Sequence, residues 1–499
     1  MRVVTAARVL TGYDEAGNAR FLEQAALLLN GDRIEQVTPA SHAPVGAPII
    51  ADYPDHVLVP GLVNAHHHVG LTPLQSGSLD HHLEEWIGTG TVRRGLDPYL
   101  DTLCSAIEMV CSGITTVQHI TGVSFRPASA MRHFASEVLR AYRDIGMRAS
   151  FCFNARDQNH LSHESDAALI ARASGALRED LGSYLAQGPV DLADYLKLFD
   201  DLTADVAREA RLAIQLAPAN LHWCSDAMLL ALRDKAAVAN VPMHMHLVET
   251  PYQAEYARRR TGKSAVAHLA QLGLLGPRMT LGHGVWLSPG DIDLLAQTGT
   301  CICHNCSSNL RLGSGRAPMT DYFGKGLTVA LGIDEAGVND DRDMWLEMRM
   351  ALYQHRDPGI GAAWPSASQV MRAATEGGAA TTLFGDSIGR IAPGALADFT
   401  VIDWNRATRP YQDPGVPLIN VLVQRVKPEA VAAVWVAGDR IVNNGRPEHI
   451  DRESIFSQIA AHLSRPRDEV DQRGLRISQG VPPLIRDFFA QYDFKPKQR

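Results

Sequence analysis

Three adjacent histidines, His66, His67 and His68, are the residues of this chain whose type and spacing most clearly suggest chemistry. They follow the apolar run Val59–Val63, which is typical of a buried strand. Because side chains alternate across a strand, His66 and His68 share one face and His67 points to the other. Two neutral imidazoles on one face form half of a transition-metal site, whereas the alternative is a polar loop.

More residues of metal-ligand type end other predicted strands. A second His-x-His pair ends in His246, and Glu249 follows it by three residues. His283 lies between two glycines, and Asp334 ends the apolar run Leu331–Ile333. A single histidine or aspartate at a strand end is usually a hydrogen-bonded structural residue. Several of them on different strands, in this order, predict a shared site at the carboxyl ends of the strands.

The elements that must position these residues are βα units. Between residues 60 and 387, apolar β runs alternate with longer helical stretches, which predicts parallel strands with helices between them. The expected strands are Leu62–His66, Thr115–His119, Ala149–Phe153, Leu212–Leu216, Pro242–His246, Met279–His283, Thr300–His304 and Leu327–Ile333. Eight such strands predict an α/β fold, a closed (β/α)8 TIM barrel.

Short β runs occur at both ends of the chain, for example Ala25–Leu29 and Val431–Val436. Neither end has enough strands to bury a sheet alone, so residues 1–59 and 388–450 are expected to build one composite β-sandwich domain. Residues 451–499 combine a helical stretch with the charge-rich end Lys495–Arg499. We expect this tail to pack on the molecule or to contact another subunit of a homo-oligomer.

Composition excludes several classes of partner. Lys and Arg number 47 against 55 Asp and Glu, so the net charge of -8 gives no reason to expect nucleic acid. No apolar run approaches the roughly 18 residues of a membrane span. Seven cysteines in a long chain, an odd number without regular spacing, argue against a disulfide framework. The expected setting is reducing and cytoplasmic, with a small-molecule substrate.

The order of the motifs PGLVNAHHH, HMHLVE, LGH, HNCSSN and GID resembles the amidohydrolase superfamily, over about residues 1–445. Within it, the chain is most similar to the aminohydrolases and chlorohydrolases, which include guanine and cytosine deaminases and triazine hydrolases. The resemblance implies that four residues bind one divalent metal, zinc in the first place and iron as the alternative. The four implied ligands are His66, His68, His246 and Asp334. Related binuclear enzymes need a lysine at the end of the fourth strand, and Leu212–Pro218 contains none.

The implied reaction is hydrolytic deamination of an amino-substituted nitrogen heterocycle of the purine, pyrimidine, pterin or triazine type. A metal-bound hydroxide attacks the ring carbon, Asp334 or Glu249 takes its proton, and Glu249 protonates the ring and the leaving group. His283 holds the hydroxide or the developing anion. The same site could displace a halide or an alkylamine, or cleave a urea or carbamate C–N bond. A scaffold without activity is the remote alternative, because the set of ligands is complete.

The substrate contacts are less defined by the sequence. Trp86 is a candidate for stacking on a ring, whereas His119 could touch the substrate or only hydrogen-bond a residue of the metal site. An extra carboxylate, Glu335, follows the metal aspartate, which leaves the identity of the substrate open. The candidate substrate-binding residues are Trp86, His119, His222, His304 and Asn309.

Overall fold

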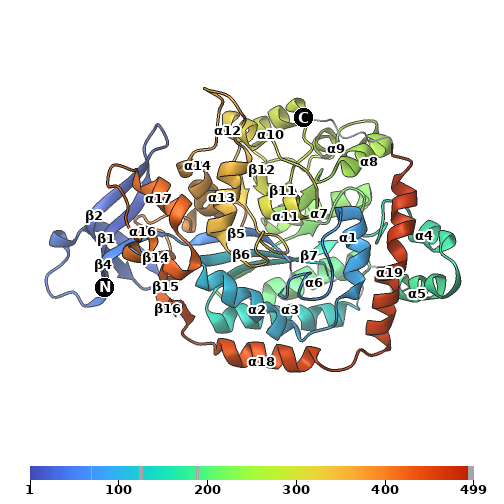
Figure 1. Ribbon diagram of the computed structural model, residues 1–499, viewed down its shortest axis with the longest axis horizontal. Helices are drawn as coiled ribbons and strands as arrows, with labels where there is room; N and C mark the ends of the chain where they lie inside the picture. Colours follow the sequence, from blue (N-terminus) through green and yellow to red (C-terminus); the bar gives the residue numbers. More distant parts are fainter. Residues whose placement is uncertain (69, 123–126, 187, 189, 493–499) are drawn as a thin grey trace.

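The computed structural model describes residues 1–68, 70–122, 127–186, 188 and 190–492. A β sheet made from the two ends of the chain lies beside a barrel made from its middle (Figure 1). The barrel strands are β5 (Leu62–His67), β6 (Ile114–Thr121), β7 (Arg148–Ala155), β8 (Leu212–Ile214), β10 (Met243–Leu247), β11 (Met279–His283), β12 (Cys301–His304) and β13 (Val329–Leu331). Each expected strand is present, with its ends shifted by a few residues.

The barrel consists of two parallel sheets, one from β5 to β8 and one from β10 to β13, and the short strand β9 (Ala217–Pro218) pairs with β7. Single β-bridges join the two sheets, His67 with Asp334 on one side and Leu216 with Met243 on the other. At the first junction the Asp334 N–H donates to the His66 carbonyl at 2.8 Å. The predicted (β/α)8 barrel is therefore confirmed.

Helices follow the barrel strands, and many begin where the sequence supplies a cap or a proline. Ser225 and Ser288 accept hydrogen bonds from the first turn of their helices, and Pro98, Pro251 and Pro289 each stand in the first turn of a helix. The helices are α1 (Leu83–Thr89), α2 (Pro98–Cys111), α3 (Ala128–Ile145), α4 (Asp166–Arg172), α5 (Gly175–Leu185), α6 (Leu192–Asp205), α7 (Asp226–Ala239), α8 (Pro251–Thr261), α9 (Ala265–Gln271), α10 (Pro289–Thr298), α11 (Cys306–Arg311), α12 (Met319–Gly324), α13 (Met344–Gln354), α14 (Ala367–Arg372) and α15 (Gly378–Ala380).

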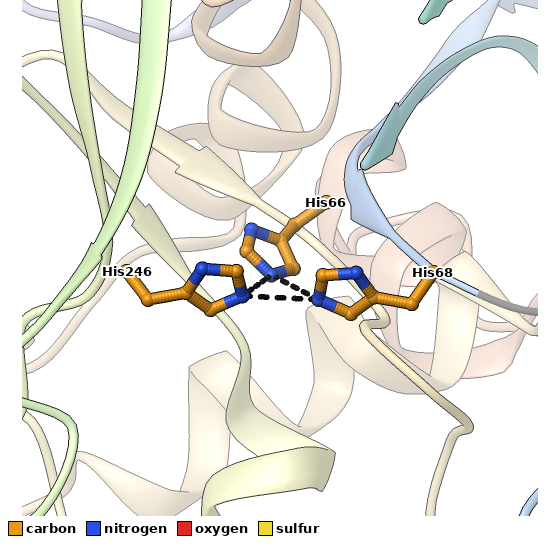
Figure 2. Close-up of side chains that lie close together, drawn as sticks. All are labelled: His66, His68 and His246. Carbon is orange, nitrogen blue, oxygen red and sulfur yellow. Dashed lines mark hydrogen bonds between the residues drawn. The ribbon is translucent and has the colours of Figure 1, made fainter. Parts of the chain in front are cut away.

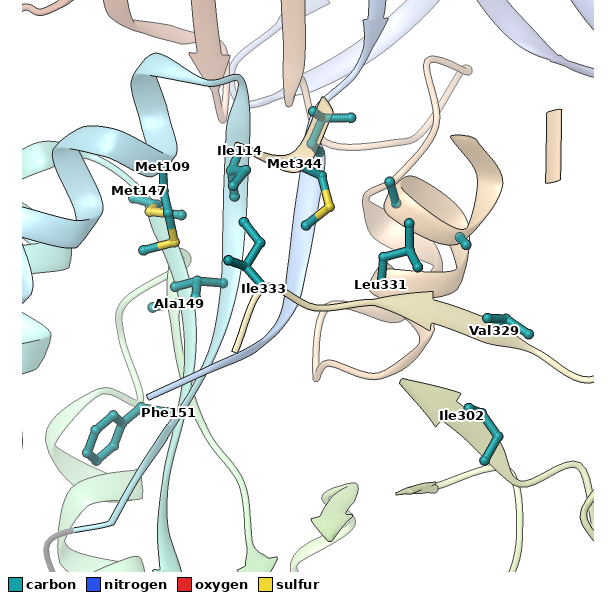
Figure 3. Close-up of a cluster of buried hydrophobic side chains, with 14 of the residues drawn as sticks. Met109, Ile114, Met147, Ala149, Phe151, Ile302, Val329, Leu331, Ile333 and Met344 are labelled. Carbon is teal, nitrogen blue, oxygen red and sulfur yellow. The ribbon is translucent and has the colours of Figure 1, made fainter. Parts of the chain in front are cut away.

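The main hydrophobic core lies between the barrel strands and these helices. Figure 3 shows part of it, where Met109 of α2 and Met344 of α13 approach side chains of the strands. Phe151 of β7 and Leu331 of β13 are among the strand residues, and all four side chains are fully buried. Close packing of this layer fixes the direction of each strand, and hence the positions of the residues at its end.

The sheet beside the barrel contains eight strands in the order β17-β16-β15-β14-β4-β1-β2-β3. They are β1 (Arg2–Tyr13), β2 (Ala19–Asn30), β3 (Arg33–Pro39), β4 (Ile49–Pro60), β14 (Phe399–Asp403), β15 (Val431–Val436), β16 (Asp439–Asn443) and β17 (Arg446–Pro447). Both chain ends contribute, as predicted, and side chains from the two ends, such as Leu27 of β2 and Trp435 of β15, pack into one core. All eight strands pair in one continuous path. The reason is β4, which pairs with β1 and, through its last residues, with β14.

The chain closes with α16 (Trp404–Thr408), α17 (Leu418–Arg425), α18 (Arg452–Leu463) and α19 (Glu469–Phe489). The last two form the predicted tail, and α19 lies between α1 and the pair α4 and α5 (Figure 1). The expectation for Lys495–Arg499 lies outside the described residues. Within the described part of the chain, no helix is both long and apolar enough to cross a membrane. All seven cysteines fall in this part and are free thiols.

Candidate metal centre and active site

Three imidazoles meet at the carboxyl end of the barrel. His66 and His68 come from the end of β5, and His246 comes from β10. Their Nε2 atoms are 2.9 Å apart for His66 and His68, 3.1 Å for His66 and His246, and 3.0 Å for His68 and His246. Figure 2 shows the three rings pointing these nitrogens toward one another. A triangle of ring nitrogens is therefore present where the sequence predicts a metal.

The other nitrogen of each ring is hydrogen-bonded, and this determines the tautomer. Nδ1 of His68 faces the Ile120 carbonyl, and Nδ1 of His246 lies 3.0 Å from the Ala219 carbonyl. A carbonyl only accepts, so both rings carry a proton on Nδ1, and Nε2 is the nitrogen that can bind a metal. Nδ1 of His66 lies 2.8 Å from Nε2 of His244, which fits the same assignment. Three lone pairs that face each other repel unless a proton or a cation lies between them.

A carboxylate completes this group. Asp334 Oδ1 lies 3.1 Å from Nε2 of His68 and 3.7 Å from Nε2 of His66. Ligands held about 2.0–2.1 Å from one tetrahedral zinc ion are about 3.3 Å apart, so these spacings fit a divalent ion. Burial lowers the pKa of His68, but the adjacent Asp334 raises it to about 9, so the group attracts a positive charge. The structure thus brings together all four residues that the sequence suggests as ligands.

Backbone geometry at the strand ends turns these side chains into the barrel. Asp334 and His283 both have a positive φ, at 65° and 70°, which non-glycine residues rarely adopt. Gly332 precedes Asp334 by two residues, and a Cβ there would lie 2.5 Å from the Cβ of His66. Only glycine allows β13 to approach β5 so closely. Both of these residues have predicted chemical roles, and strained backbone is common at functional sites.

Glu249 and His283 lie beside the four ligands. Glu249 Oε1 is 3.5 Å from Nδ1 of His283, and His283 Nε2 is 3.6 Å from Asp334 Oδ2. Ser314 donates to the Glu249 carboxyl at 3.2 Å, and Gln253 accepts from the Glu249 backbone N–H at 2.9 Å. Burial and the nearby Asp334 raise the pKa of Glu249 well above its ordinary value. This shift favours the protonated form of the carboxyl, which is the form that can donate a proton.

His283 is neutral and fixed in orientation. Burial lowers its pKa, and its Nδ1 lies 2.9 Å from the Asn309 side-chain oxygen, which accepts the proton of that nitrogen. Asn305 donates to Nε2 of the same ring at 3.2 Å. Asn309 thus holds His283, rather than contacting a substrate directly.

A cavity of about 400 Å³ opens over this centre. Its lining includes His68, His246, Glu249, His283 and Asp334, and Trp86 stands in its wall as predicted. The rest of the lining includes aromatic, charged and amide side chains. Among them are Arg93, Asn154, Arg156, Tyr184, Trp223 and Glu335. The size is in the range of pockets that hold small molecules.

The other four candidate substrate contacts do not line this cavity in the described part of the chain. His119 bonds Tyr142 and the His68 carbonyl through its two ring nitrogens, so it supports the end of β5 instead. His222 is buried against the ring of His163, and His304 meets His355 at 2.8 Å between Nε2 atoms. Asn309 holds His283. In each case a protein partner occupies the polar atoms or covers the ring.

Several cavity residues are not expected from the sequence. Arg156 follows the third barrel strand directly, so the rule that strand ends carry functional residues could have found it. Trp223 is adjacent to the candidate residue His222, and its ring lies 5.0 Å from the Arg156 guanidinium carbon. Arg93 and Glu335 lie 3.6 Å apart and come from different loops, a proximity that no local pattern predicts.

Comparison with known proteins shows the family and agrees with the fold. The model of the amidohydrolase family matches residues 57–441, and the chain therefore belongs to this family. A 5-methylthioadenosine/S-adenosylhomocysteine deaminase of Syntrophobacter fumaroxidans is 29% identical over 88% of this chain and 93% of its own length. A 5'-deoxyadenosine deaminase of Methanosarcina barkeri is 25% identical over 91% of this chain and 95% of its own length.

Solved structures share the fold. An adenosine deaminase from Xanthomonas campestris with bound zinc has a TM-score of 0.73 and 24% identity, covering 96% of this chain and 98% of that protein. An atrazine chlorohydrolase from Arthrobacter aurescens complexed with zinc has a TM-score of 0.78 and 23% identity, covering 92% and 99%. At these identities the similarity establishes the architecture, a barrel with an added sheet.

Proposed function

We propose that the protein is a metal-dependent aminohydrolase that releases ammonia from an amino-substituted nitrogen heterocycle, with an adenosine-type ring as the preferred substrate. One observation carries this proposal: Glu249 is a buried carboxyl, 3.5 Å from His283, beside the group of three histidines and Asp334, and its pKa is raised. Hydrolytic deamination of a ring needs such an acid, because the ring nitrogen and the leaving amine must both be protonated.

The residues His66, His68, His246 and Asp334 fit one divalent ion, since three neutral nitrogens and one carboxylate converge there. Zinc is the first choice, because the donor set is typical of it and solved relatives contain it, while iron accepts the same donors. When bound, the ion supplies Lewis-acid activation of water at neutral pH. One ion rather than two is expected, because Leu212–Pro218 at the end of the fourth strand contains no lysine of the kind that related binuclear enzymes need.

The roles of the neighbouring residues follow from their protonation. Glu249 donates its proton to the ring nitrogen, and its carboxylate then takes a proton from water and delivers it to the leaving amine. His283 stays neutral, and Asn309 fixes its ring toward Asp334, so that both side chains flank the position of attack. The carboxylate of Asp334 accepts a hydrogen bond or a proton from the attacking water.

The substrate class rests on the relatives together with the cavity. Curated relatives are named as deaminases of methylthioadenosine, S-adenosylhomocysteine and 5'-deoxyadenosine. The cavity of about 400 Å³ is lined by Trp86 and Trp223, whose flat faces suit a planar ring. These features favour an adenosine-type ring over the pyrimidine, pterin and triazine alternatives.

A substrate panel tests the proposal. The protein is loaded with zinc and offered adenosine, 5'-methylthioadenosine, 5'-deoxyadenosine, guanine, cytosine, a pterin and amino- or chloro-substituted triazines, while ammonia, alkylamine and chloride are measured. We expect ammonia from the adenosine-type compounds. Release of chloride or alkylamine alone would replace this function by displacement of those leaving groups at the same site. The homo-oligomeric state and the cytoplasmic location remain predictions from the sequence.

A further inference from the structure

The C-terminal helix α19 (Glu469–Phe489) lies beyond residue 441, where the match to the amidohydrolase family ends. It packs along α1 and the short 3₁₀ segment Gly90–Val92 that follows α1 (Figure 1). These two segments supply one wall of the cavity, including Trp86, Ile87 and Thr91. The wall over the metal centre therefore rests on an element that is not part of the barrel.

Polar contacts attach this wall to the tail. Arg94, itself a cavity residue, donates from Nε to Asp471 of α19 at 2.9 Å, and its side chain is only 15% exposed against 13% for Asp471. Both terminal nitrogens of Arg94 donate to backbone carbonyls, one to Leu463 at the end of α18 and one to Pro466 in the segment that follows. Because the pair is largely shielded from solvent, breaking it leaves a poorly solvated charge, so the contact resists displacement.

The backbones also approach closely. Thr91 donates from its hydroxyl to the Gly474 carbonyl of α19 at 3.0 Å. A Cβ on Gly474 would lie 2.3 Å from the Thr91 carbonyl oxygen, and a Cβ on Gly88 would lie 2.7 Å from Val481. The two sides therefore meet at a distance that only glycine permits.

A second face of α19 contacts α5: Arg476 donates to Asp180 at 2.7 Å, and a Cβ on Gly480 would lie 2.9 Å from Leu177. Ile477 and Ile485 pack against Leu181 and Leu185 of α5 in a hydrophobic cluster separate from the main core. Tyr184, on the same helix α5, lines the cavity. One helix thus joins two walls of the cavity that belong to different loops of the barrel.

We propose that α19 is a positioning element for the substrate cavity, with Arg94 and Asp471 as positioning residues that hold α1 against the mouth of the barrel. The kinetic part of this inference rests on the proposed function. Glu249 is held by Gln253 and Ser314, which lie on other elements, so a displaced wall affects substrate binding more than turnover.

Two substitutions test this inference independently. Asp471→Asn removes the carboxylate charge that pairs with Arg94. Gly474→Ala adds a Cβ that clashes with the Thr91 carbonyl and forces α19 away, although alanine itself favours a helix. In the zinc-loaded full chain, we expect KM to rise about tenfold in each variant, with kcat and zinc content changed by less than about twofold. We also expect faster hydrogen exchange of the backbone amides of residues 83–96, a measurement that needs no substrate.

Matched controls are available on α18 and α5, the helices next to α19. Glu453→Gln breaks the ion pair with Arg452 on α18, in which the side chains are 77% and 46% exposed. Gly182→Ala adds a methyl group to α5 where no neighbouring atom lies within 4 Å. Both controls should keep the KM and the exchange rates of the parent.

The inference is overturned if Asp471→Asn and Gly474→Ala both fold and keep the parent KM. It is also overturned if exchange at residues 83–96 is unchanged, whatever the activity. If the parent protein itself releases no ammonia from any compound, the proposed function fails, and the exchange rates alone then decide whether α19 holds α1.

Discussion

The protonation of individual rings explains why His66, His68 and His246 form a metal site rather than a cluster of buried histidines. Acceptors at Nδ1 of His68 and His246 hold a proton there, so that Nε2 is the nitrogen that can bind a metal. Burial and the neighbouring rings also hold the pKa of His66 and His246 well below the ordinary value, so both stay neutral. Neutral imidazole is the form that binds a metal.

Substitution of His66 and of His67 tests whether the two faces of β5 have different roles in metal binding. His66→Ala removes one corner of the triangle and should abolish zinc retention, whereas His67→Ala should keep it. The reason is that Nε2 of His67 lies 3.2 Å from the Ser105 hydroxyl of α2, on the outer side of the barrel. Metal analysis of both purified variants checks this difference. Loss of zinc in His67→Ala to the same extent as in His66→Ala would contradict the assignment.

The residues with metal-binding chemistry could be predicted from sequence because their types and the two-residue period of a strand define them locally. His66 and His68 had to share a face, and the structure brings them together. The substrate contacts could not be predicted in this way. His119 ends the second strand as expected, but its ring nitrogens are occupied by Tyr142 and the His68 carbonyl, a long-range arrangement that no local pattern contains.

At the scale of elements, α13 is attached to α11, the helix that follows β12, by a buried carboxyl. Glu347 accepts hydrogen bonds from the Ser307 N–H at 3.0 Å and from the Ser307 hydroxyl. Burial raises the pKa of Glu347 from 4.5 to about 7, although these hydrogen bonds oppose the shift. The fold therefore favours the protonated form of this side chain.

This shift predicts how stability depends on pH. Between its unfolded value near pH 4.5 and its folded value near pH 7, the unfolded chain has lost the proton that the folded chain keeps, so stability falls as the pH rises. Glu347→Gln removes the titrating group. We expect the stability of the parent relative to this variant to decrease by up to about 3 kcal/mol across the window. Denaturant unfolding at several pH values measures it, and a constant difference would contradict the burial of an ionisable group.

The elements themselves were predictable where periodicity is strong and less so where packing intervenes. The strand expected over Leu327–Ile333 is shortened to Val329–Leu331, because Gly332 lies against His66 and Asp334 takes a positive φ. At the chain ends the strand patterns predict a sandwich. In the structure β4 pairs with strands from both ends and links all eight strands in one path, a choice of partners that strand patterns do not encode.

For the whole molecule, a buried ion pair connects the barrel with the added sheet. Arg148 of β7 donates to both carboxyl oxygens of Asp398, at 2.8 and 3.1 Å, and the two side chains are 0% and 1% exposed. Asp398 also accepts from the Ala437 N–H at 2.7 Å. The pair therefore fixes β7 relative to the sheet and stabilises the junction from which the barrel strands extend.

Asp398→Asn leaves the Arg148 charge buried and should destabilise the protein by about 3–5 kcal/mol. A matched control is Asp439→Asn, because Arg211 and Asp439 also join the barrel to the sheet, but their side chains are 27% and 60% exposed. This exposed pair should contribute less than about 1 kcal/mol. Denaturant unfolding of the zinc-loaded proteins compares the two. Equal losses would mean that burial does not determine the strength of this junction.

The central claim is that the four ligands and Glu249 form one aminohydrolase centre. The most direct measurement is ammonia release from adenosine-type substrates by the zinc-loaded parent and by Glu249→Gln, with zinc quantified in the same samples. We predict one zinc per chain in both proteins, ammonia from the parent, and turnover lower by about 10²–10⁴-fold in the variant, because only the acid is lost. Equal turnover in the two proteins, or a zinc-loaded parent that releases no ammonia from any compound in the panel, would contradict the claim.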